Sequence, residues 1–527
     1  MRSSLTPTIL CLTALSSSVF DAPTAMAQWS TAALSEARYE IYAVEVDGVA
    51  LFAGGVFDSD TVDLYHSSTE SWSIHQLSEA RLIFGGARIG SKALFIGGVT
   101  ASQQRSDNVD IYDAASDTWS VAALSQPRSG ITTAVAGTKV FIAGGVDPAV
   151  TNSVDVYDAA TDSWTLTTLS VARTAMAGAS VGNYALFAGG WDYSTFFTTV
   201  DIYDASTGSW SVAQLSQARS HITAQVVGSK VIFAGGTIGW PLRVVDIFDS
   251  STGTWSTAQL ASRRNLCASV TVGSKALFIG GGHFDLTLGV GMPSRLVDIY
   301  DDSTGAWSTW EMNSHCGGHR STTVVGGKVL IGGQAIWSPT AFPVYVPVVD
   351  VYDASADIWY ATELSQPRIH LAALTVGGKA MFAGGEQFGA GVYDTVDIYE
   401  ELGTEYCVAS PNSTGLGAEM FMVGSKRLAD DSLGLRAGPI PDTLSLFVYS
   451  PAAQVVPFAD GYSCVGAPLF RLDPPLPAVG RMAAKRVLTS QLSLVPGTLY
   501  FQCFYRDPAA GGTGLNSSNG YALDFVP

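Results

Sequence analysis

The chain has 527 residues, of which 28 are Lys or Arg and 46 are Asp or Glu, so its net charge is −18. This acidic balance argues against nucleic acid and anionic membrane surfaces as partners. Only 14% of the residues are charged while 55 are glycine, which is typical of a β-rich chain with many tight turns and little helix.

The N-terminal segment has the pattern of a secretory signal peptide. Arg2 precedes an apolar run from Ile9 to Phe20, and Ala25-Met26-Ala27 follows as a small-residue cleavage site. The run is too short to span a membrane, and no later stretch is long and apolar enough to do so. We therefore predict that residues 1–27 are removed. The mature protein is expected to be a monomer without a membrane span, secreted or held at the cell surface.

A repeated pattern follows, in which a Trp-Ser, a Leu-Ser, an Arg, a Gly-Gly and a Val-Asp-(Ile/Val/Leu)-(Tyr/Phe) recur in a fixed order. The Gly-Gly pairs are 43, 47, 45, 46, 45, 52 and 52 residues apart, and they begin at Gly54, Gly97, Gly144, Gly189, Gly235, Gly280, Gly332 and Gly384. A period of this size indicates a propeller or a solenoid.

Each period contains four short runs rich in Val, Ile, Phe and Tyr, separated by Gly, Asp, Ser and Thr, which predicts four strands. We letter these strands A to D, and in one copy they are predicted at residues 222–227, 231–234, 244–248 and 255–259. This pattern resembles the kelch repeat. The resemblance implies an all-β fold, an eight-bladed kelch-type β-propeller over residues 28–402, with the recurring Trp and Tyr packed between blades. Propellers of this family include oxidases, epimerases and binding modules, so the fold leaves the function open.

The repeat stops near residue 405, and strand-like runs at 443–449, 488–494 and 498–505 predict a small β-sandwich-like domain over residues 405–527. This segment resembles a C-terminal domain of secreted planctomycete proteins. The motifs that carry the resemblance are Tyr406-Cys407, Pro411-Asn-Ser-Thr-Gly415, Gly461-Tyr-Ser-Cys464 and Phe501-Gln-Cys-Phe-Tyr-Arg-Asp-Pro508. It implies an extracellular appendage without a known activity.

Five cysteines remain after removal of the signal peptide. Cys267 and Cys316 fall at different levels of neighbouring strands, which argues against a disulfide between them. We predict one disulfide among Cys407, Cys464 and Cys503, because an exported protein folds in an oxidising compartment. Which pair forms is left open.

Closure of the ring is a separate question, because the first Trp precedes the first strand A and the last repeat runs into the tail. We predict that residues 29–34 form the outer strand of the last blade. The alternative is that the tail supplies this strand, since Tyr406 follows Tyr399 at the spacing that separates Tyr203 from Trp210.

The alternating strand direction places the D–A and B–C connections on one face of the propeller and the A–B and C–D turns on the other. All variation in length lies in the B–C loops, at residues 191–199, 237–243, 282–296 and 334–348. Variable loops on a rigid scaffold are where binding usually occurs. We therefore predict that an extracellular glycan or protein binds to this face. The candidate aromatic residues are Trp191, Tyr193, Trp240, Phe284, Trp337 and Tyr345.

An arginine precedes strand A in seven repeats, while the seventh repeat has Gly317 instead. The arginines are Arg38, Arg81, Arg128, Arg173, Arg219, Arg264 and Arg368. One interpretation is that each bonds loop carbonyls or the recurring Asp of strand C. The other is a basic ring for an acidic ligand, with Arg38, Arg219 and Arg368 as ligand-binding candidates.

Two residues beyond the arginine position, repeats 1, 7 and 8 carry Glu40, His319 and His370, which become neighbours when the ring closes. Such a trio suits a divalent metal or acid–base chemistry. The alternative, which we favour, is a set of polar side chains at a hydrated channel mouth that also contact the ligand. We accordingly predict a binding protein without cofactor or metal. The alternative function is a carbohydrate-active epimerase that resembles the sialic acid mutarotases, specifically N-acetylneuraminate epimerase.

Overall fold

The computed structural model divides the chain into two compact units, Trp29–Glu401 and a second unit, Leu402–Pro527. The predicted signal peptide lies outside the described residues. No helix in the described part of the chain is long and apolar enough to cross a membrane. The structure describes residues 29–525 except 57–58, 84, 266–267, 286–289, 313, 317–320, 339–340, 356, 401–403, 408, 414–416, 424–432, 442, 480–481, 488–491, 493–496 and 511.

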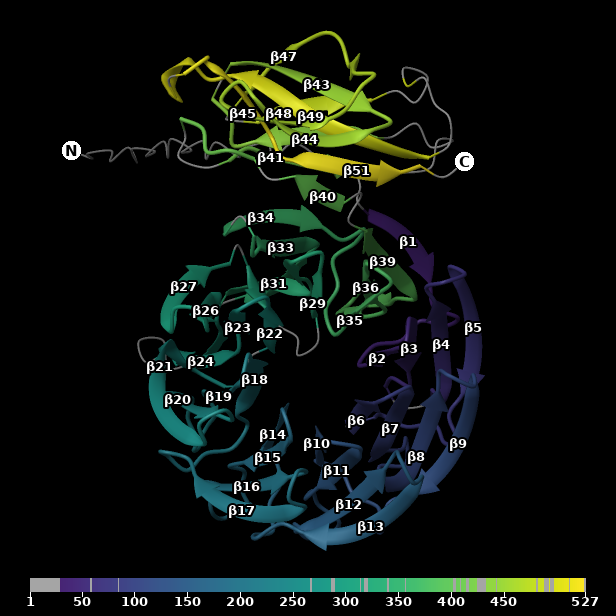
Figure 1. Ribbon diagram of the computed structural model, residues 1–527. Helices are drawn as coiled ribbons and strands as arrows, with labels where there is room; N and C mark the ends of the chain where they lie inside the picture. The colour runs from purple at the N-terminus through teal and green to yellow at the C-terminus, as the bar shows by residue number, and fades with distance from the viewer. Residues whose placement is uncertain are drawn as a thin grey trace, which may run out of the picture. The chain divides into compact units, whose positions relative to one another are not determined.

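The described residues of the first unit form eight four-stranded antiparallel sheets. Figure 1 shows these sheets following one another around a ring, with the first strand of each sheet toward the centre and the last at the rim. This is the arrangement of a β-propeller, and each sheet is one blade. In blade 5 the strands are β18 (Thr223–Val227), β19 (Lys230–Ala234), β20 (Leu242–Asp249) and β21 (Thr254–Arg264), which confirms the four predicted strands.

The other blades repeat this order. Blade 1 consists of β2 (Tyr42–Val46), β3 (Val49–Ala53), β4 (Thr61–His66) and β5 (Ser71–Gln76), and blade 2 of β6 (Gly85–Ile89), β7 (Lys92–Val99), β8 (Arg105–Asp113) and β9 (Thr118–Ala123). Blade 3 consists of β10 (Thr132–Ala136), β11 (Lys139–Ala143), β12 (Ser153–Asp158) and β13 (Ser163–Thr168). Blade 4 consists of β14 (Ala177–Val181), β15 (Tyr184–Ala188), β16 (Thr199–Asp204) and β17 (Ser209–Gln214). Blades 6 and 7 consist of β22 (Ala268–Val272), β23 (Lys275–Ile279), β26 (Leu296–Asp301) and β27 (Ala306–Glu311); and β29 (Thr322–Val325), β30 (Lys328–Ile331), β33 (Val348–Asp353) and β34 (Ile358–Glu363).

Blade 8 closes the ring with strands from both ends of the unit. Its inner strands are β35 (Ala372–Val376), β36 (Lys379–Ala383) and β39 (Thr395–Glu400), and its outer strand is β1 (Trp29–Ala33). Trp29 lies opposite Tyr399 in the ladder, and its indole N–H donates to Thr362 Oγ1 of blade 7 at 2.8 Å. The prediction that the N-terminal strand closes the ring is confirmed. The alternative strand from the tail is wrong, because β40 (Thr404–Cys407) pairs within the second unit.

The apolar core of the first unit lies between neighbouring blades. In every blade the Trp at the start of the outer strand packs on the Tyr or Phe of the strand before it, with ring centroids 4.8–5.4 Å apart. One cluster joins Leu51 and Leu64 of blade 1 to Phe95 of blade 2, all almost fully buried. Deleting a large aromatic side chain from such a core costs about 3–5 kcal/mol. The predicted packing role of these Trp and Tyr residues is confirmed.

The second unit is also built of strands. One sheet contains β40, β43 (Leu444–Ser450), β46 (Phe470–Arg471), β47 (Leu476–Pro477), β49 (Thr498–Arg506), β50 (Leu515–Ser517) and β51 (Gly520–Asp524). A second contains β41 (Glu419–Val423), β42 (Gly434–Gly438) and β48 (Ala483–Arg486), and β44 (Ala453–Phe458) pairs with β45 (Gly461–Val465). Met422 and Phe501, one from each larger sheet, belong to a single buried core.

The cysteines of the second unit form one disulfide, as predicted. Cys407 is bonded to Cys464, with the two Cα atoms 6.1 Å apart, and Cys503 is a free, buried thiol. Burial raises the pKa of the Cys503 thiol well above its usual range, so this thiol is unreactive in the folded protein. The expectation that Cys267 and Cys316 form no disulfide with each other remains a prediction, because Cys267 and the side chain of Cys316 lie outside the described residues.

Candidate functional site

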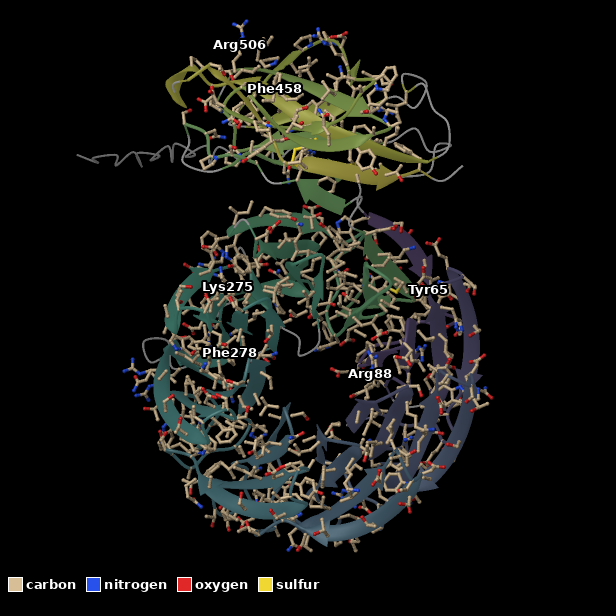
Figure 2. The ribbon with its side chains drawn as sticks, in the orientation of Figure 1. Tyr65, Arg88, Lys275, Phe278, Phe458 and Arg506 are labelled. Carbon is tan, nitrogen blue, oxygen red and sulfur yellow. A yellow bond between two sulfur atoms is a disulfide. The ribbon has the colours of Figure 1, made fainter. Side chains whose placement is uncertain are left out.

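The two faces of the propeller differ in their connections. On the face that carries the A–B and C–D turns, short turns repeat from blade to blade, and lysines join neighbouring blades. Lys275 donates to Tyr352 at 2.6 Å and pairs with Asp357 at 2.7 Å, and Lys379 donates to Tyr65 at 3.2 Å (Figure 2). We call this the turn face, and its recurring contacts hold the ring together.

The opposite face, which we call the loop face, carries the D–A and B–C connections. Its B–C loops contain additional short strands. These are β24 (Gly282–Asp285), β25 (Val290–Pro293), β31 (Gln334–Ser338), β32 (Ala341–Val346), β37 (Glu386–Gln387) and β38 (Gly391–Val392), and β28 (His315–Cys316) joins β31 from a D–A connection. The described residues of these loops thus pair with one another outside the four-stranded sheets.

Exposed large apolar side chains of the described first unit occur in two places, the outer strands of the blades and the B–C loops. The turns of the turn face between described residues carry none. In the loops, Tyr193 is 58% exposed, Trp240 is 57% exposed and Phe388 is 79% exposed, and Ile336, Val344 and Val392 are exposed as well. Of the two faces, the loop face is therefore the one that carries apolar surface which a ligand can remove from water.

The predicted aromatic residues differ in how they are placed. Trp191 is partly buried, with its ring 4.7 Å from that of Tyr193 and stacked 5.7 Å from that of Phe196. Tyr345, on β32, is also partly buried. The side chains of Phe284 and Trp337 lie outside the described residues. Of the predicted aromatics whose side chains are described, Tyr193 and Trp240 are therefore the rings most available to a ligand.

The arginines are internal to the blades. Arg219 and Arg368 are fully buried and Arg38 is nearly so, and each pairs with the Asp of the third strand of its blade, Asp246, Asp397 and Asp63. Arg368 also donates to the carbonyls of Gly384 and Phe382 at 2.7 and 3.1 Å. Burial lowers the pKa of Arg38 and Arg219 below its usual range, and the negative charge of the paired Asp offsets part of this effect by raising it.

The assignment of Arg219 and Arg368 as ligand-binding residues is therefore wrong, because both side chains are fully buried in their blades. Arg38 is turned toward Asp63 in the same way but also lines the cavity described below, so its assignment stays a prediction. The structural interpretation, in which the arginine bonds loop carbonyls and the recurring Asp, is confirmed in the seven blades that have the arginine.

Blade 7, which lacks the arginine, uses a glutamine that the sequence interpretation missed. Gln334 is fully buried, and its amide donates to Asp350 Oδ2 at 3.0 Å and to the carbonyl of Ile331 at 2.8 Å. Gln334 directly follows a Gly-Gly pair, at a position where the other repeats carry Val, Trp, Thr, Gly or Glu, so the sequence did not mark it.

A cluster of ionisable side chains lies where blades 8 and 1 meet on the loop face. His370 Nδ1 is 2.8 Å from Glu386 Oε1, and His370 Nε2 is 4.0 Å from Glu40 Oε1. The backbone joins the same residues, since the Glu40 N–H donates to the His370 carbonyl at 3.1 Å. The predicted proximity of Glu40 and His370 is confirmed. His319 lies outside the described residues, and Glu386 is a member that the sequence interpretation missed.

Tyr39 completes this cluster. Its ring stacks beside that of His370 at 6.2 Å. Burial raises the pKa of the Tyr39 hydroxyl, and the negative charges of Glu386 and Glu40 raise it further, so this phenol is neutral and can donate a hydrogen bond at neutral pH. No three His, Cys, Asp or Glu side chains in the described ranges come close enough to hold a metal ion. The imidazole, the carboxylates and the phenol of this cluster can transfer protons and form hydrogen bonds.

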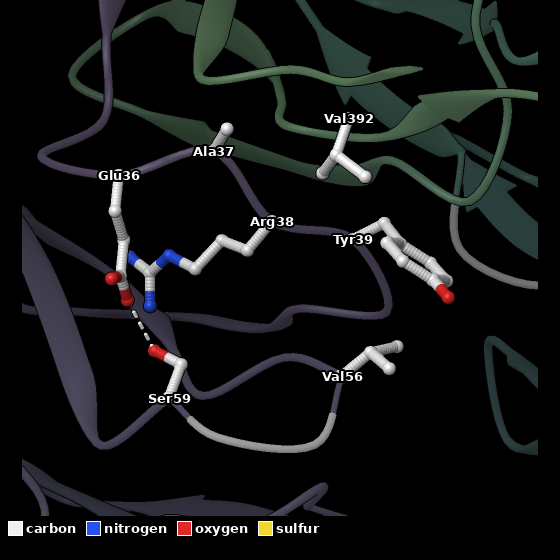
Figure 3. Close-up of a pocket in the computed structure, with 7 residues that line it drawn as sticks. All are labelled: Glu36, Ala37, Arg38, Tyr39, Val56, Ser59 and Val392. Atoms are coloured by element: carbon white, nitrogen blue, oxygen red, sulfur yellow. Dashed lines mark hydrogen bonds between the residues drawn. The ribbon is translucent and has the colours of Figure 1, made fainter. Parts of the chain in front are cut away.

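A cavity of about 270 Å³ adjoins the cluster through Tyr39 (Figure 3). It lies between the D–A connection that enters blade 1 and the B–C loops of blades 1 and 8. It is lined by Glu36, Ala37, Arg38, Tyr39, Val56, Ser59 and Val392. The carboxylate of Glu36 accepts a hydrogen bond from the Ser59 hydroxyl across the cavity. Burial raises the pKa of Glu36, but hydrogen bonds from Ser59 and Thr61 and the charge of Arg38 outweigh burial, so the net pKa is lowered.

Comparison with known proteins identifies part of the chain. Residues 40–236 match a family model described as the KLHDC2/KLHL20/DRC7 Kelch-repeats domain. No curated protein is similar in sequence. The solved structure titled "Structure of YjhT" is 17% identical, with a TM-score of 0.38, and the match covers 61% of this chain and 98% of that chain. Similarity of this degree says nothing about function.

Proposed function

Because residues 40–236 form a kelch-repeat domain, we propose that this protein is an exported binding protein whose propeller recognises a carbohydrate or a protein on its loop face. The observation that carries this proposal is the exposure of Tyr193, Trp240 and Phe388 on B–C loops of three different blades. Aromatic rings with one free face contribute strongly to binding, because they bury a large area at a small entropic cost. The rigid blades beneath supply preorganisation.

The proposal extends to the whole chain. An eight-bladed kelch-type propeller over residues 28–402 presents the ligand-binding loops, and a sandwich-like β-domain over residues 405–527 is an appendage. The signal peptide pattern and the disulfide of the second unit support an extracellular location. N-terminal sequencing of protein recovered from the culture medium of expressing cells tests this location, with Gln28 as the expected first residue.

A glycan array and an array of extracellular proteins, both probed with the purified full chain, test the binding function. The variant Tyr193→Ala/Trp240→Ala/Phe388→Ala is expected to lose binding. The matched control is Ile74→Ala/Val121→Ala/Val212→Ala, which removes three equally exposed apolar side chains from the outer strands. If both triple variants bind as the parent does, the loop face is not the binding surface.

A second candidate is a carbohydrate-active epimerase, favoured by the His370 cluster. Glu386 orients the imidazole of His370 through Nδ1, and Glu40 faces Nε2. One of these side chains can therefore take a proton from the anomeric hydroxyl of a sugar, while another of them donates a proton to the oxygen of the sugar ring. The C–O bond of the sugar ring breaks, and it re-forms on the other face of the carbonyl. NMR exchange measurements on free reducing sugars test this activity, and His370→Gln is expected to abolish it. Equal exchange rates with and without the protein would reject it.

A further inference from the structure

Tyr193 combines exposure with an unfavourable backbone conformation. Its φ is 73°, in the left-handed region that glycine and asparagine occupy readily and a bulky aromatic residue avoids. Strain of this kind persists only where the surroundings enforce it, and it is common at ligand-binding positions. The chain therefore keeps a tyrosine ring at a position where a smaller residue would fit the backbone better.

The loop that holds Tyr193 is tightly fixed. Asp192 Oδ1 accepts hydrogen bonds from the N–H and the hydroxyl of Ser194, at 2.9 and 2.7 Å, and from the Thr195 N–H at 2.7 Å. The Phe197 N–H donates to the Gly190 carbonyl at 2.9 Å, which ties the loop to the end of β15. The ring is thus presented to solvent by an ordered turn, and little entropy remains to be lost on binding.

The neighbouring rings support Tyr193 from one side. Trp191 meets it with an interplanar angle of 59°, and Phe196 stacks behind Trp191 with an interplanar angle of 9°. Both supporting rings are partly buried, whereas Tyr193 is exposed. Trp191 and Phe196 therefore hold the platform, and Tyr193 is its accessible surface.

The surroundings of this platform are rich in hydroxyl groups and carry one negative charge, and the His221 ring lies 6.5 Å from that of Trp191. Asp192 is its charged residue, and that carboxylate is engaged in the turn, which lowers its pKa through the Ser194 and Thr195 hydrogen bonds. Ser194 and Thr195 are both exposed beside the ring. A protein hot spot normally lies in a recess that a surrounding rim seals from water. A projecting ring edged by hydroxyl groups instead matches a sugar ring, which has one apolar C–H face and hydroxyls at its perimeter.

We propose that Tyr193 is a stacking platform for the apolar face of a neutral sugar ring, with Ser194 and Thr195 as hydrogen-bonding partners at its edge. This proposal rests on the proposed function, since it names the ligand class that the loop face recognises on blade 4.

Calorimetric titration of the full chain with cellohexaose, xylohexaose and mannohexaose tests the proposal. At least one of these neutral oligosaccharides is expected to bind. Tyr193→Phe keeps the ring and should stay within about threefold of the parent affinity, whereas Tyr193→Gly should weaken binding about tenfold. Because glycine suits the backbone at this position, Tyr193→Gly should also melt at the same or a higher temperature. Val212→Ala, which removes an exposed apolar side chain from the outer strand of the same blade, is the control and should bind as the parent does.

Three outcomes would overturn the proposal. The first is parent-like binding by Tyr193→Gly. The second is a clear fall in its melting temperature, which would make the ring a structural element of the loop. The third is a parent protein that binds none of the neutral oligosaccharides. Binding to a charged glycan or a protein in that last case would leave the proposed function standing and reject the neutral sugar.

Discussion

Replacing Arg128 with methionine tests whether the buried arginines hold the blades together. Arg128 Nη2 donates to Asp155 Oδ2 at 2.6 Å and to the Ile142 carbonyl at 3.0 Å, and Nε donates to the Gly144 carbonyl at 3.0 Å. Methionine fills much of the same volume but leaves the Asp155 carboxylate buried without its counter-charge. Breaking a buried ion pair in this way costs about 3–5 kcal/mol. In a unit of this size that corresponds to a fall of roughly 5 °C in Tm.

Urea denaturation followed by tryptophan fluorescence measures this loss. The matched control is Arg295→Met, because the pair Arg295–Glu311 is 42% and 56% exposed and should contribute less than about 1 kcal/mol. The double variant Arg128→Met/Asp155→Asn should recover part of the loss, since it also removes the unpaired charge. A single variant as stable as the control, or one that loses ligand binding without losing stability, would refute the structural role of Arg128.

Three further predictions follow from contacts described above. Trp29→Ala should destabilise the first unit by about 2–3 kcal/mol in urea denaturation, because it removes a half-buried indole that packs on Tyr399 and Phe382. The control Ser30→Ala, at an exposed position of the same strand, should have no effect. If Trp29→Ala is as stable as the parent, β1 does not secure the closure of the propeller. Cys407→Ser/Cys464→Ser should destabilise the second unit by about 4 kcal/mol in calorimetry, since the bond closes a loop with a sequence separation of 57 residues; an unchanged transition would contradict this. Glu36→Gln should cost more stability at pH 7 than at pH 3. The pKa of Glu36 is lowered in the folded protein, so its carboxylate stabilises the fold above its ordinary pKa and loses this contribution as the pH falls through the folded pKa. A difference in unfolding free energy between variant and parent that does not change with pH would argue against the Ser59 and Arg38 contacts.

The strands could be predicted because their signals are local. In blade 5 the predicted strand at residues 231–234 corresponds to β19 (Lys230–Ala234), since alternating apolar residues and the Gly-Gly that follows determine its position within a residue or two. Ring closure was also predictable, because the count of Trp residues showed which outer strand was missing from the last repeat.

The site was less predictable, because side-chain direction depends on packing between distant segments. The position of Arg219 before strand A allowed two interpretations, a ligand contact or a pairing with the Asp of strand C, and only the folded blade shows that Asp246, 27 residues later, turns it inward. Glu386 was missed for a related reason. It follows a Gly-Gly pair, where the first three repeats have valine, and only the folded loop brings it to His370.

The pairing of β1 with β39 also determines the order in which the protein is able to fold. Trp29 begins the first strand, and its partner Tyr399 is made only after all the other blades. Contacts between such distant residues form slowly, because most of the chain must be arranged before they provide any stability. Until then the outer edge of blade 8 is open, and an open strand edge pairs readily with other chains. A polypeptide that ends before Thr395 therefore leaves its first strand without a partner, and both of its ends become starting points for aggregation.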